Sequence, residues 1–336
     1  MTAEILPTHT PALFATAVKR AADLLSAGEV VALPTETVYG LAANAFDAVA
    51  VSKIYETKGR PAHNPAIVHV ASAEMARHCV ACWSVPAEQL AKSFWPGPLT
   101  MVLPKSKEIP DLVTAGGPTV GVRWPSHPFI QAVIRECGFP LAAPSANLSN
   151  QISPTNAEHV RKQLGSRIRL IVDGGQSQVG IESTVIDLTT EPPGVLRPGM
   201  IHEESLAATI GELRTRNLEH GNEHAIRSPG LLRRHYAPKA QLIVLGWRDD
   251  RELRSHLSVL TSHLGKCHVI AHTNIPSGDD LAGVSVIPRD AEAFARAIYA
   301  ELHRCDEAVA ELIVVEALPD APAWRAIADR LRRAAA

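Results

Sequence analysis

Short polar clusters interrupt the apolar runs of this sequence, and their side chains are mostly hydroxyls and cations. The first, PTETVYG, places Thr35, Glu36 and Thr37 directly after the apolar run VVAL. Such a run is typical of a buried strand, after which a plain turn needs only two or three polar residues. The number of hydroxyls around one carboxylate exceeds that need and makes this loop a candidate site.

Further clusters have the same character, and most of them lie at the ends of expected strands. They are KGRPAHNPAIVHV with Lys58, Arg60, Asn64 and His69; PTVGVRWP with Thr119 and Arg123; APSANLSNQISPT with Ser145, Asn147, Ser149 and Ser153; DGGQSQVGIESTV with Ser183 and Thr184; and VLRPG with Arg197. Open α/β sheets bind their ligands beyond the ends of strands. We therefore expect a ligand site where these clusters meet.

The arginines Arg60, Arg123 and Arg197 interrupt or adjoin apolar strands, where a cation needs an anionic partner because an unpaired buried charge is costly. A salt bridge would explain any one of them, and the helix dipole would favour Lys58 and Arg60 at a helix C-terminus. His69 alone is typical of a core histidine. Several cations with many hydroxyls and few carboxylates instead favour an anionic ligand. No Walker loop, zinc-hydrolase spacing or nucleophile elbow is present, so the residues predict an α/β enzyme that binds a polyanion.

The elements that must position these clusters alternate between helices and short strands. Apolar spacing predicts a helix over residues 11–25, and Asp47 and Gly59 are suited to cap a helix over residues 48–58. Thr155 and Glu158 form a capping box before a helix within residues 156–165. Runs of strand length lie at residues 66–70, 99–103, 119–124, 169–173 and 183–188. This alternation predicts an α/β domain over residues 1–216.

Residues 217–240 break the alternation, since they are polar, contain glycine and proline, and lack sustained periodicity. They predict a linker that carries an RRHY cluster with Arg234, His235 and Tyr236. Residues 241–336 return to a regular series of strands and helices, which predicts a smaller Rossmann-like domain with a parallel sheet. This region has no G-x-G-x-x-G, so we expect no dinucleotide there.

Composition narrows the class of protein. Of 336 residues, 46% are hydrophobic and 20% charged, which suits two packed domains rather than disorder. A net charge of −2 argues against a protein that mainly coats nucleic acid. We find no secretory signal and no apolar run of about 20 residues, so we expect a cytoplasmic protein. The cysteines are too scattered for a disulfide framework, and Cys79 and Cys82 lack the second pair that a zinc site needs.

Several sequence blocks occur in the order found in a known family. PTETVYGLAANA, KGRPAHNP, FWPGPLTMVL, TVGVRWPSH, APSANLS, ESTVIDLT and VLRPG resemble the YrdC-like threonylcarbamoyl-AMP synthases over residues 10–205. The SPG…RHYAPKA segment and the series after it resemble the two-domain form of that family, which has a C-terminal Rossmann-like domain. The resemblance implies a twisted mixed sheet around a basic central cavity.

For this chain, the resemblance implies an enzyme that condenses L-threonine, bicarbonate or CO2, and ATP into threonylcarbamoyl-AMP and pyrophosphate. It implies Mg²⁺ with the ATP, and a separate transferase complex that passes the threonylcarbamoyl group to position 37 of ANN-decoding tRNAs. Such a reaction needs cations and hydroxyls that hold anionic reagents in line, and it needs no protein nucleophile. The polar clusters have that chemistry.

The resemblance also implies roles for individual residues. Lys58 and Arg60 would be catalytic cations in contact with ATP. The residues expected to bind L-threonine are Thr35, Thr37, His69, Arg123, Ser183 and, through its backbone, Ala143. The residues expected to bind ATP are Lys58, Arg60, Asn64, Thr119, Ser145, Asn147, Ser153 and Arg197, with Arg234, His235 and Tyr236 from a linker that would close over the site. Glu36 would orient its loop or help to hold magnesium, and the alternative for the RRHY segment is an ordinary basic linker.

The main rival interpretation is a double-stranded RNA- or tRNA-binding module without catalysis, since the family's domain has a basic concave face. The net charge and the lack of RNP or KH motifs weigh against RNA binding as the primary role and leave at most a weak tRNA contact. A carbamoyl-transfer subunit of the hydrogenase-maturation kind shares the domain. Those chains resemble fusions with an acylphosphatase domain and zinc-finger cysteines, neither of which occurs here.

The chain departs from the family pattern at one turn. The family's SAN-x-S-G has a glycine where this sequence has Asn150. Asparagine adopts positive φ more readily than other non-glycine residues, so we expect the turn to survive.

Overall fold

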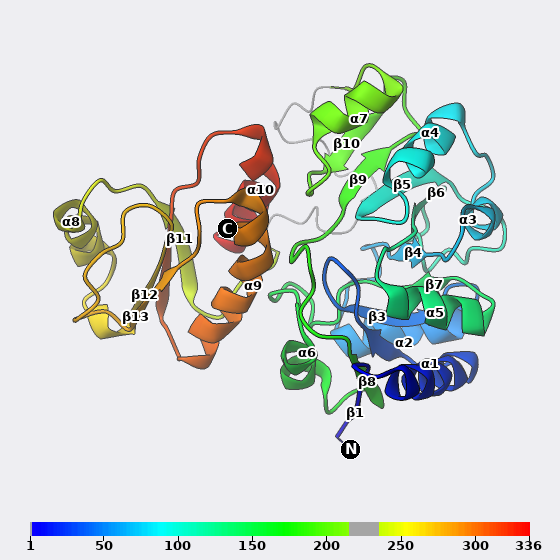
Figure 1. Ribbon diagram of the computed structural model, residues 1–336, viewed down its shortest axis with the longest axis horizontal. Coiled ribbons are helices and arrows are strands. Elements are labelled where there is room, and N and C mark those ends of the chain that lie inside the picture. The colour runs from blue at the N-terminus through cyan, green and yellow to red at the C-terminus, as the bar shows by residue number, and fades with distance from the viewer. Residues whose placement is uncertain (1, 215–234) are drawn as a thin grey trace. The chain divides into compact units, whose positions relative to one another are not determined.

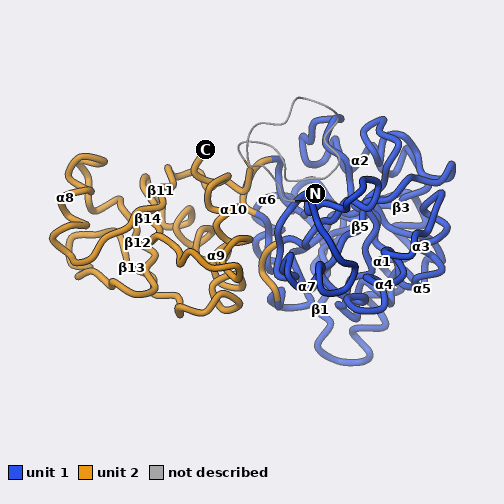
Figure 2. Tube along the Cα trace, turned by 90° about the horizontal axis from the view of Figure 1, so that it is seen from above, with its two compact units in different colours: residues 1–149, 153–178, 182–231 blue, residues 150–152, 179–181, 232–336 orange. Residues whose placement is uncertain are grey.

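The computed structural model describes residues 2–214 and 235–336, which divide into two compact units (Figures 1 and 2). Of these residues, unit 1 holds 2–149, 153–178 and 182–214, and unit 2 holds 150–152, 179–181 and 235–336. Arg234, which we expected to contact ATP, lies outside the described residues. In the described part of the chain, no helix is both long and apolar enough to span a membrane.

The described strands of unit 1 form a ten-stranded mixed sheet in the order β1-β8-β2-β3-β7-β4-β6-β5-β9-β10. They are β1 (Glu4–Pro7), β2 (Val31–Leu33), β3 (Gly40–Asn44), β4 (Ile67–His69), β5 (Leu99–Pro104), β6 (Thr119–Arg123), β7 (Leu141–Ala142), β8 (Leu170–Asp173), β9 (Thr184–Asp187) and β10 (Gly194–Arg197). β2 pairs in parallel with β8 but antiparallel with β3, and β4 pairs in parallel with β6 but antiparallel with β7. The predicted mixed sheet is confirmed.

Seven helices are described in unit 1: α1 (Pro11–Ser26), α2 (Ala48–Lys58), α3 (Ala73–Cys79), α4 (Val85–Phe94), α5 (Pro128–Cys137), α6 (Ala157–Leu164) and α7 (Glu203–Ile210). α2 begins and ends as predicted. The Asp47 carboxylate accepts hydrogen bonds from the backbone N–H groups of Val49 and Ala50, and Gly59 ends the helix with a φ of 58°. Lys58, the last residue of α2, is therefore held at a defined point.

The predicted capping box of α6 is wrong in its register. The N-cap is Asn156, whose side chain accepts a hydrogen bond from the backbone N–H of His159 at 2.9 Å. The Thr155 hydroxyl lies 3.3 Å from Nδ1 of His159 instead. Asparagine caps helices at least as well as threonine, which explains the shift by one residue.

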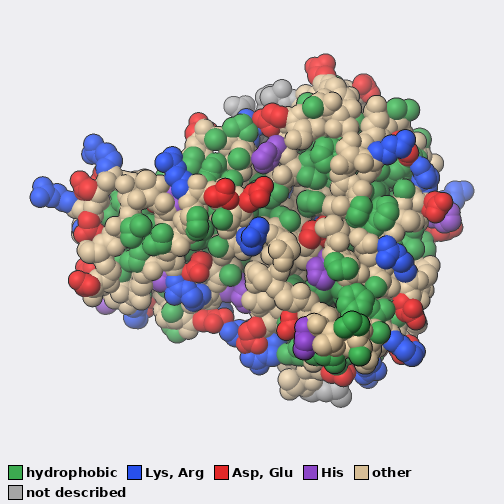
Figure 3. All heavy atoms as spheres, in the orientation of Figure 1, with side chains coloured by type: hydrophobic (Ala, Val, Ile, Leu, Met, Phe, Trp, Pro, Cys, Tyr) green, Lys and Arg blue, Asp and Glu red, His purple; other side chains and the backbone are tan. Residues whose placement is uncertain are grey.

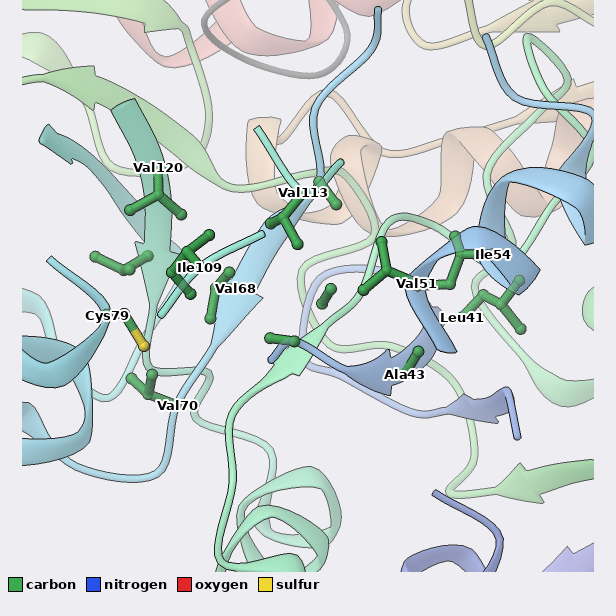
Figure 4. Close-up of a cluster of buried hydrophobic side chains, with 14 of the residues drawn as sticks. Leu41, Ala43, Val51, Ile54, Val68, Val70, Cys79, Ile109, Val113 and Val120 are labelled. Carbon is green, nitrogen blue, oxygen red and sulfur yellow. The ribbon is translucent and has the colours of Figure 1, made fainter. Parts of the chain in front are cut away.

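Buried apolar side chains fix these elements against one another. Figure 4 shows part of one cluster, in which Leu41 of β3, Val68 of β4 and Val120 of β6 lie with Val51 and Ile54 of α2. Each of these side chains is at most 1% exposed, and full burial of one such side chain contributes roughly 1.5–3 kcal/mol. The strands and the helix that carry the polar clusters thus share one rigid core.

Unit 2 has a sheet of its own, with strand order β11-β14-β12-β13 and only parallel pairs among the described strands. Its elements are β11 (Gln241–Leu245), α8 (Asp250–Leu260), the 3₁₀ helix η1 (Leu264–Lys266), β12 (Cys267–Ala271), β13 (Gly283–Val286), α9 (Ala291–Glu307), β14 (Leu312–Glu316), η2 (Pro322–Trp324) and α10 (Arg325–Ala334). The small parallel-sheet fold predicted after the linker is confirmed.

Two short segments that come earlier in the chain also belong to unit 2. Gln151 forms a parallel β-bridge with Ala237, and the backbone N–H of Ala237 donates to the carbonyl of Asn150 at 3.0 Å. Asn150 has a φ of 66°, so the turn that we expected in place of the family's glycine is present. Backbone hydrogen bonding thus joins Ala237 to Asn150 within unit 2.

Candidate active site

Arg123, the last residue of β6, is the centre of the first polar cluster. Its Nη1 donates a hydrogen bond to Thr37 Oγ1 at 2.9 Å, and its Nη2 lies 2.7 Å from Glu36 Oε1. Thr37 Oγ1 lies 3.0 Å from Thr35 Oγ1, and all four side chains are buried. The structure therefore joins two sequence clusters, PTETVYG and TVGVRWP, through one guanidinium.

This contact bridges distant parts of the sheet. β2 and β7 run in one direction and β4 and β6 in the other, because β2–β3, β3–β7 and β7–β4 are all antiparallel pairs. The strands β2 and β6 are also four positions apart in the sheet, which is about 19 Å at the usual strand spacing. The loop after β2 must therefore cross the intervening strands to bring Glu36 and Thr37 to Arg123.

His69 lies beside Arg123, since the parallel register of β4 and β6 pairs these two residues. Burial and the neighbouring Arg123 charge lower the pKa of His69 to about 3, so its imidazole is neutral at physiological pH. Burial acts to raise the pKa of Glu36, but Arg123 and the backbone N–H of Ser126 outweigh it and hold that pKa below its usual value. Glu36 is therefore ionised. Among the described residues, neither Glu36 Oε2 nor His69 Nδ1 has a hydrogen-bond partner.

The second cluster forms around Lys58. Its Nζ donates hydrogen bonds to the backbone carbonyls of Ser145 and Asn147 and lies 3.4 Å from Asn147 Oδ1. Burial and the nearby Arg60 charge lower the pKa of Lys58 well below its usual value. All of these acceptors are neutral, although the side chain is only 2% exposed. In the described chain, the buried Lys58 amine thus has no carboxylate at salt-bridge distance, and an anion beside it would favour its charged form.

Arg60 and Asn64 extend this cluster. Arg60 Nε donates to the Asn64 carbonyl at 3.0 Å, and Nη2 donates to Asn64 Oδ1 at 2.7 Å and to the Pro65 carbonyl at 2.6 Å. Asn64 is 1% exposed, and its Nδ2 has no partner among the residues described. The amide donor of Asn64 is available to an acceptor group on a ligand.

The third cluster contains Ser183 and Arg197. Arg197 Nε donates to the Ser183 carbonyl at 3.1 Å, its Nη2 lies 3.1 Å from Ser183 Oγ, and that hydroxyl lies 2.8 Å from Thr100 Oγ1. Glu182, the residue before Ser183, accepts a hydrogen bond from Ser153 Oγ at 2.6 Å through its Oε1. Ser183 is therefore bonded to a hydroxyl and a guanidinium, neither of which can act as the base of a nucleophilic serine.

Backbone contacts join the clusters. Gly40 and Ser145 form an antiparallel bridge, and the N–H of Ala146 donates to the Tyr39 carbonyl at 2.7 Å. A side chain at Gly40 would meet Ala143 Cβ at 3.3 Å, which is a tight contact. The PTETVYG loop and the APSAN loop therefore lie against each other, with Ala143 between them.

The 97–98 turn makes the corresponding link to the third cluster. Arg123 Nε donates to the Gly97 carbonyl at 3.3 Å, and the N–H of Thr184 donates to the Pro98 carbonyl at 3.0 Å. The same short turn thus holds Arg123 and Thr184, which directly follows Ser183. Arg123 and Ser183 are both expected to bind L-threonine.

Thr119, His235 and Tyr236 are also expected to bind ATP. Thr119 is the first residue of β6, four residues before Arg123 and so about 13 Å away along the strand. His235 and Tyr236 are described in unit 2, where their rings lie 4.0 Å apart and Tyr236 stacks on Tyr299 at 5.9 Å. Their expected contact with ATP remains a prediction.

Sequence reasoning missed residues that complete these clusters. Glu182 binds Ser153, Thr100 faces Ser183, and the Tyr39 hydroxyl donates to the Gly175 carbonyl at 2.7 Å. Thr100 lies within an apolar strand and carries no local signal. Glu182 is the acidic residue beside Ser183 in a glycine-rich turn, and that position could have indicated it.

Glu36 is the residue that we considered as a possible magnesium ligand. No group of three His, Cys, Asp or Glu side chains that could hold a metal ion occurs among the described residues. Oε1 of Glu36 lies 2.7 Å from Arg123 Nη2, so this carboxylate already has one cationic partner. The buried thiol of Cys79 has its pKa raised to about 12 by burial, which makes it a poor nucleophile at neutral pH.

Known proteins share both parts of this chain. Residues 23–199 match a family model described as "Telomere recombination", and residues 201–336 match one described as "Threonylcarbamoyl-AMP synthase, C-terminal domain". A Pyrococcus abyssi protein named threonylcarbamoyl-AMP synthase is 41% identical over 323 residues, which cover 94% of this chain and 93% of that protein. The chain belongs to the threonylcarbamoyl-AMP synthase family. It is an enzyme of the nucleotidyltransferase type.

Other members of the threonylcarbamoyl-AMP synthase family agree with this assignment. The Bacillus subtilis protein of that name is 43% identical, covering 95% of this chain and 92% of its own length. A solved structure of P. abyssi Sua5 complexed with L-threonine has a TM-score of 0.89 at 38% identity and covers 100% of this chain and 98% of that chain. Escherichia coli YciO, at 24% identity and a TM-score of 0.52, covers 59% of this chain and shares the fold.

Proposed function

We propose that this enzyme condenses L-threonine, bicarbonate or CO2, and ATP into threonylcarbamoyl-AMP and pyrophosphate. The observation that carries the proposal is the buried amine of Lys58, whose hydrogen-bond partners among the described residues are all neutral. A buried charge is retained only where a counter-ion compensates it, and a triphosphate is such an ion. The names of the related proteins and the L-threonine complex of P. abyssi Sua5 support the same substrates.

The threonine side of the site would be the cluster around Arg123. A planar guanidinium pairs with a carboxylate through two parallel hydrogen bonds, which suits Arg123 for the amino-acid carboxylate. Neutral His69, the hydroxyls of Thr35 and Thr37, Ser183 and the backbone of Ala143 would surround the rest of the molecule.

The nucleotide side would be formed by Lys58 and Arg60, with Asn64, Ser145, Asn147, Ser153 and Arg197 around them. Thr119, Arg234, His235 and Tyr236 complete the proposed ATP-binding set. Because Arg123 already neutralises Glu36, we propose that Mg²⁺ arrives on the ATP phosphates and is not held by Glu36.

The enzyme would catalyse this reaction by holding the reagents in position and stabilising negative charge, without a covalent enzyme intermediate. The α-ammonium group of threonine first loses a proton, and the free amine attacks CO2 and releases a second proton to form a carbamate. Attack on the carbon of bicarbonate gives the same carbamate, and water leaves. A carbamate oxygen attacks the α-phosphorus of ATP, the bond to the β-phosphate oxygen breaks, and pyrophosphate leaves with that electron pair. Lys58 and Arg60 would stabilise the charge that develops on the phosphates. Holding three reagents together in line removes much of their entropic barrier.

Pyrophosphate release tests this function. The protein is mixed with ATP, Mg²⁺, bicarbonate and L-threonine, and pyrophosphate is measured with and without the amino acid. We expect release that requires both L-threonine and bicarbonate. Release that is independent of the amino acid, or salt-sensitive RNA binding without ATP turnover, would instead support another function. Figure 3 shows acidic and basic side chains interspersed on the face drawn, which does not favour RNA binding as the main role.

We also propose the cellular setting that the family resemblance implies. The enzyme would work in the cytoplasm and supply threonylcarbamoyl-AMP to a separate transferase complex that modifies ANN-decoding tRNAs. Residues 1–216 would form the catalytic domain, residues 217–240 a flap, and residues 241–336 the Rossmann-like domain.

A further inference from the structure

Two charged groups in the Arg123 cluster are buried with unused hydrogen-bonding capacity. Glu36 Oε1 accepts from the backbone N–H of Ser126 at 3.0 Å and contacts Arg123, but Glu36 Oε2 has no partner in the described chain. Arg123 Nη2 forms the ion pair with Glu36 Oε1 at 2.7 Å, Nε donates to the Gly97 carbonyl and Nη1 donates to Thr37 Oγ1. These contacts do not use all five N–H groups of the guanidinium. The Glu36 and Arg123 side chains are at most 7% exposed.

Such unsatisfied atoms are rare in folded proteins. About 90% or more of buried polar groups find a partner, and each exception needs an explanation, such as contact with a ligand, an ion or an ordered water. Here one ion pair has both an unused acceptor, on the carboxylate, and an unused donor, on the guanidinium. A ligand that fits this pair must therefore offer a donor and an acceptor close together.

The charges of Arg123, Glu36 and His69 determine which ligand with a donor and an acceptor fits best. Arg123 and Glu36 together carry no net charge, and His69 is neutral because burial and Arg123 lower its pKa to about 3. A simple anion would be attracted by Arg123 but repelled by Glu36, which is held ionised because Arg123 and the Ser126 N–H lower its pKa. A zwitterion matches both, with its carboxylate on Arg123 and its ammonium group on Glu36.

We propose that Glu36 binds the α-ammonium group of the amino-acid substrate through Oε2, and so selects a free amino acid over an acid that lacks the amine. The inference rests on the proposed function, which supplies the amino acid. It gives Glu36 a direct contact with substrate in place of the loop-orienting or magnesium-binding role considered from the sequence. Opposite charges at the two ends would also fix which way the amino acid enters, with its nitrogen on the Glu36 side.

Calorimetric binding of two ligands tests the inference. L-threonine is compared with 2,3-dihydroxybutanoate, in which a hydroxyl replaces the ammonium group while the carboxylate stays. For the full-length wild type, we expect L-threonine to bind at least tenfold more tightly. In Glu36→Gln, which keeps the side-chain shape but not the charge, we expect that preference to fall to less than threefold.

Arg123→Lys is the matched control, because Arg123 would bind the carboxylate that both ligands share. It should weaken the two ligands by similar factors and leave the preference for L-threonine in place. If Glu36→Gln retains the tenfold preference, the inference is overturned. If the wild type binds neither ligand and releases no pyrophosphate, the proposed function itself has failed, which is a different result.

If Glu36→Gln does not fold, Glu36→Asp tests the contact between Glu36 and the ammonium group instead. Aspartate keeps the negative charge but has a side chain that is shorter by one methylene, so its distance to the ligand's ammonium group would increase. The distance between the ligand's carboxylate and Arg123 would not change. We expect L-threonine to lose at least threefold more affinity than 2,3-dihydroxybutanoate. Equal losses for the two ligands would contradict a contact between Glu36 and the ammonium group.

Discussion

The ammonium group of Lys58 and the backbone carbonyl of Ser145 form a hydrogen bond that joins the end of α2 to the APSAN loop. The same ammonium group donates to the carbonyl of Asn147. Lys58 therefore both fixes the loop and places a buried positive charge beside it. Since Ser145 and Asn147 are proposed nucleotide contacts, this one side chain couples the fold of the loop to the charge of the site.

Replacement of Lys58 by methionine should weaken ATP binding at least tenfold. A hydrogen bond to a charged group contributes about 1.5–3 kcal/mol, and a tenfold change in affinity is about 1.4 kcal/mol. Isothermal titration with ATP and Mg²⁺ measures the effect, and L-threonine binding should change little. The matched control is Lys53→Met on the same helix, because Lys53 is partly exposed and pairs with Glu29. ATP affinity that is unchanged in Lys58→Met would remove this residue from the site.

Replacement of Arg197 or Arg60 by alanine should abolish ATP-dependent product formation without unfolding the protein. Both guanidiniums are buried in the proposed site, where phosphate oxygens would be their anionic partners. Pyrophosphate release gives the activity, and circular dichroism checks the fold. Arg135→Ala, an exposed arginine on α5, is the control. Undiminished activity in both site variants would refute the assignment.

Acidification should destabilise unit 1 through His69. Its pKa is about 3 in the folded protein and 6.5 as a free side chain, so the unfolded state binds more protons between these values. Stability is therefore complete above pH 6.5 and falls by up to about 1.4 kcal/mol per pH unit as the pH drops below it. Urea unfolding of the wild type and His69→Asn at pH 5, 6 and 7 measures the slope.

The His69→Asn variant should show a smaller loss of stability between pH 7 and pH 5 than the wild type. His78→Asn, on the exposed side of α3, should keep the wild-type slope. If the three proteins lose stability equally, His69 is not buried in its neutral form.

Replacement of Glu316 by glutamine should destabilise unit 2 by about 2–4 kcal/mol, because charged acceptors contribute about 1.5–3 kcal/mol per hydrogen bond. The Glu316 carboxylate, at the end of β14, accepts from the backbone N–H groups of His272, Thr273 and Asn274 at 2.7, 2.8 and 3.1 Å. Denaturant unfolding measures the loss. Glu311→Gln removes an exposed ion pair and should cost much less stability than Glu316→Gln. Equal losses would contradict the account of the Glu316 carboxylate.

Local signals in the sequence were enough to predict the elements that carry the site. Asp47 and Gly59 bound α2 as expected, because caps depend on neighbouring residues alone. Where two cap residues stand side by side, as Thr155 and Asn156 do, the local signal did not decide the register. The parallel sheet of unit 2 followed from its regular alternation of strands and helices.

The contacts within the site could not be predicted in this way. Glu36 and Arg123 meet across four strands, and strand order in a mixed sheet is set by packing that no local pattern encodes. The partners of Lys58 are backbone carbonyls, which every residue has, so the sequence could not indicate them. Thr100 was missed for a similar reason, since a single hydroxyl in an apolar strand is ordinary.

The most direct test of the central claim follows the carbon of bicarbonate. The enzyme is incubated with ¹⁴C-bicarbonate, ATP, Mg²⁺ and L-threonine, and the nucleotides and the protein are separated at once. We expect the label in a species with the mass of AMP plus threonine plus CO2 minus water, formed in equal amount with pyrophosphate, and none on the protein. AMP that forms without labelled carbon, or label bound covalently to the enzyme, would contradict a reaction carried by buried cations and hydroxyls alone.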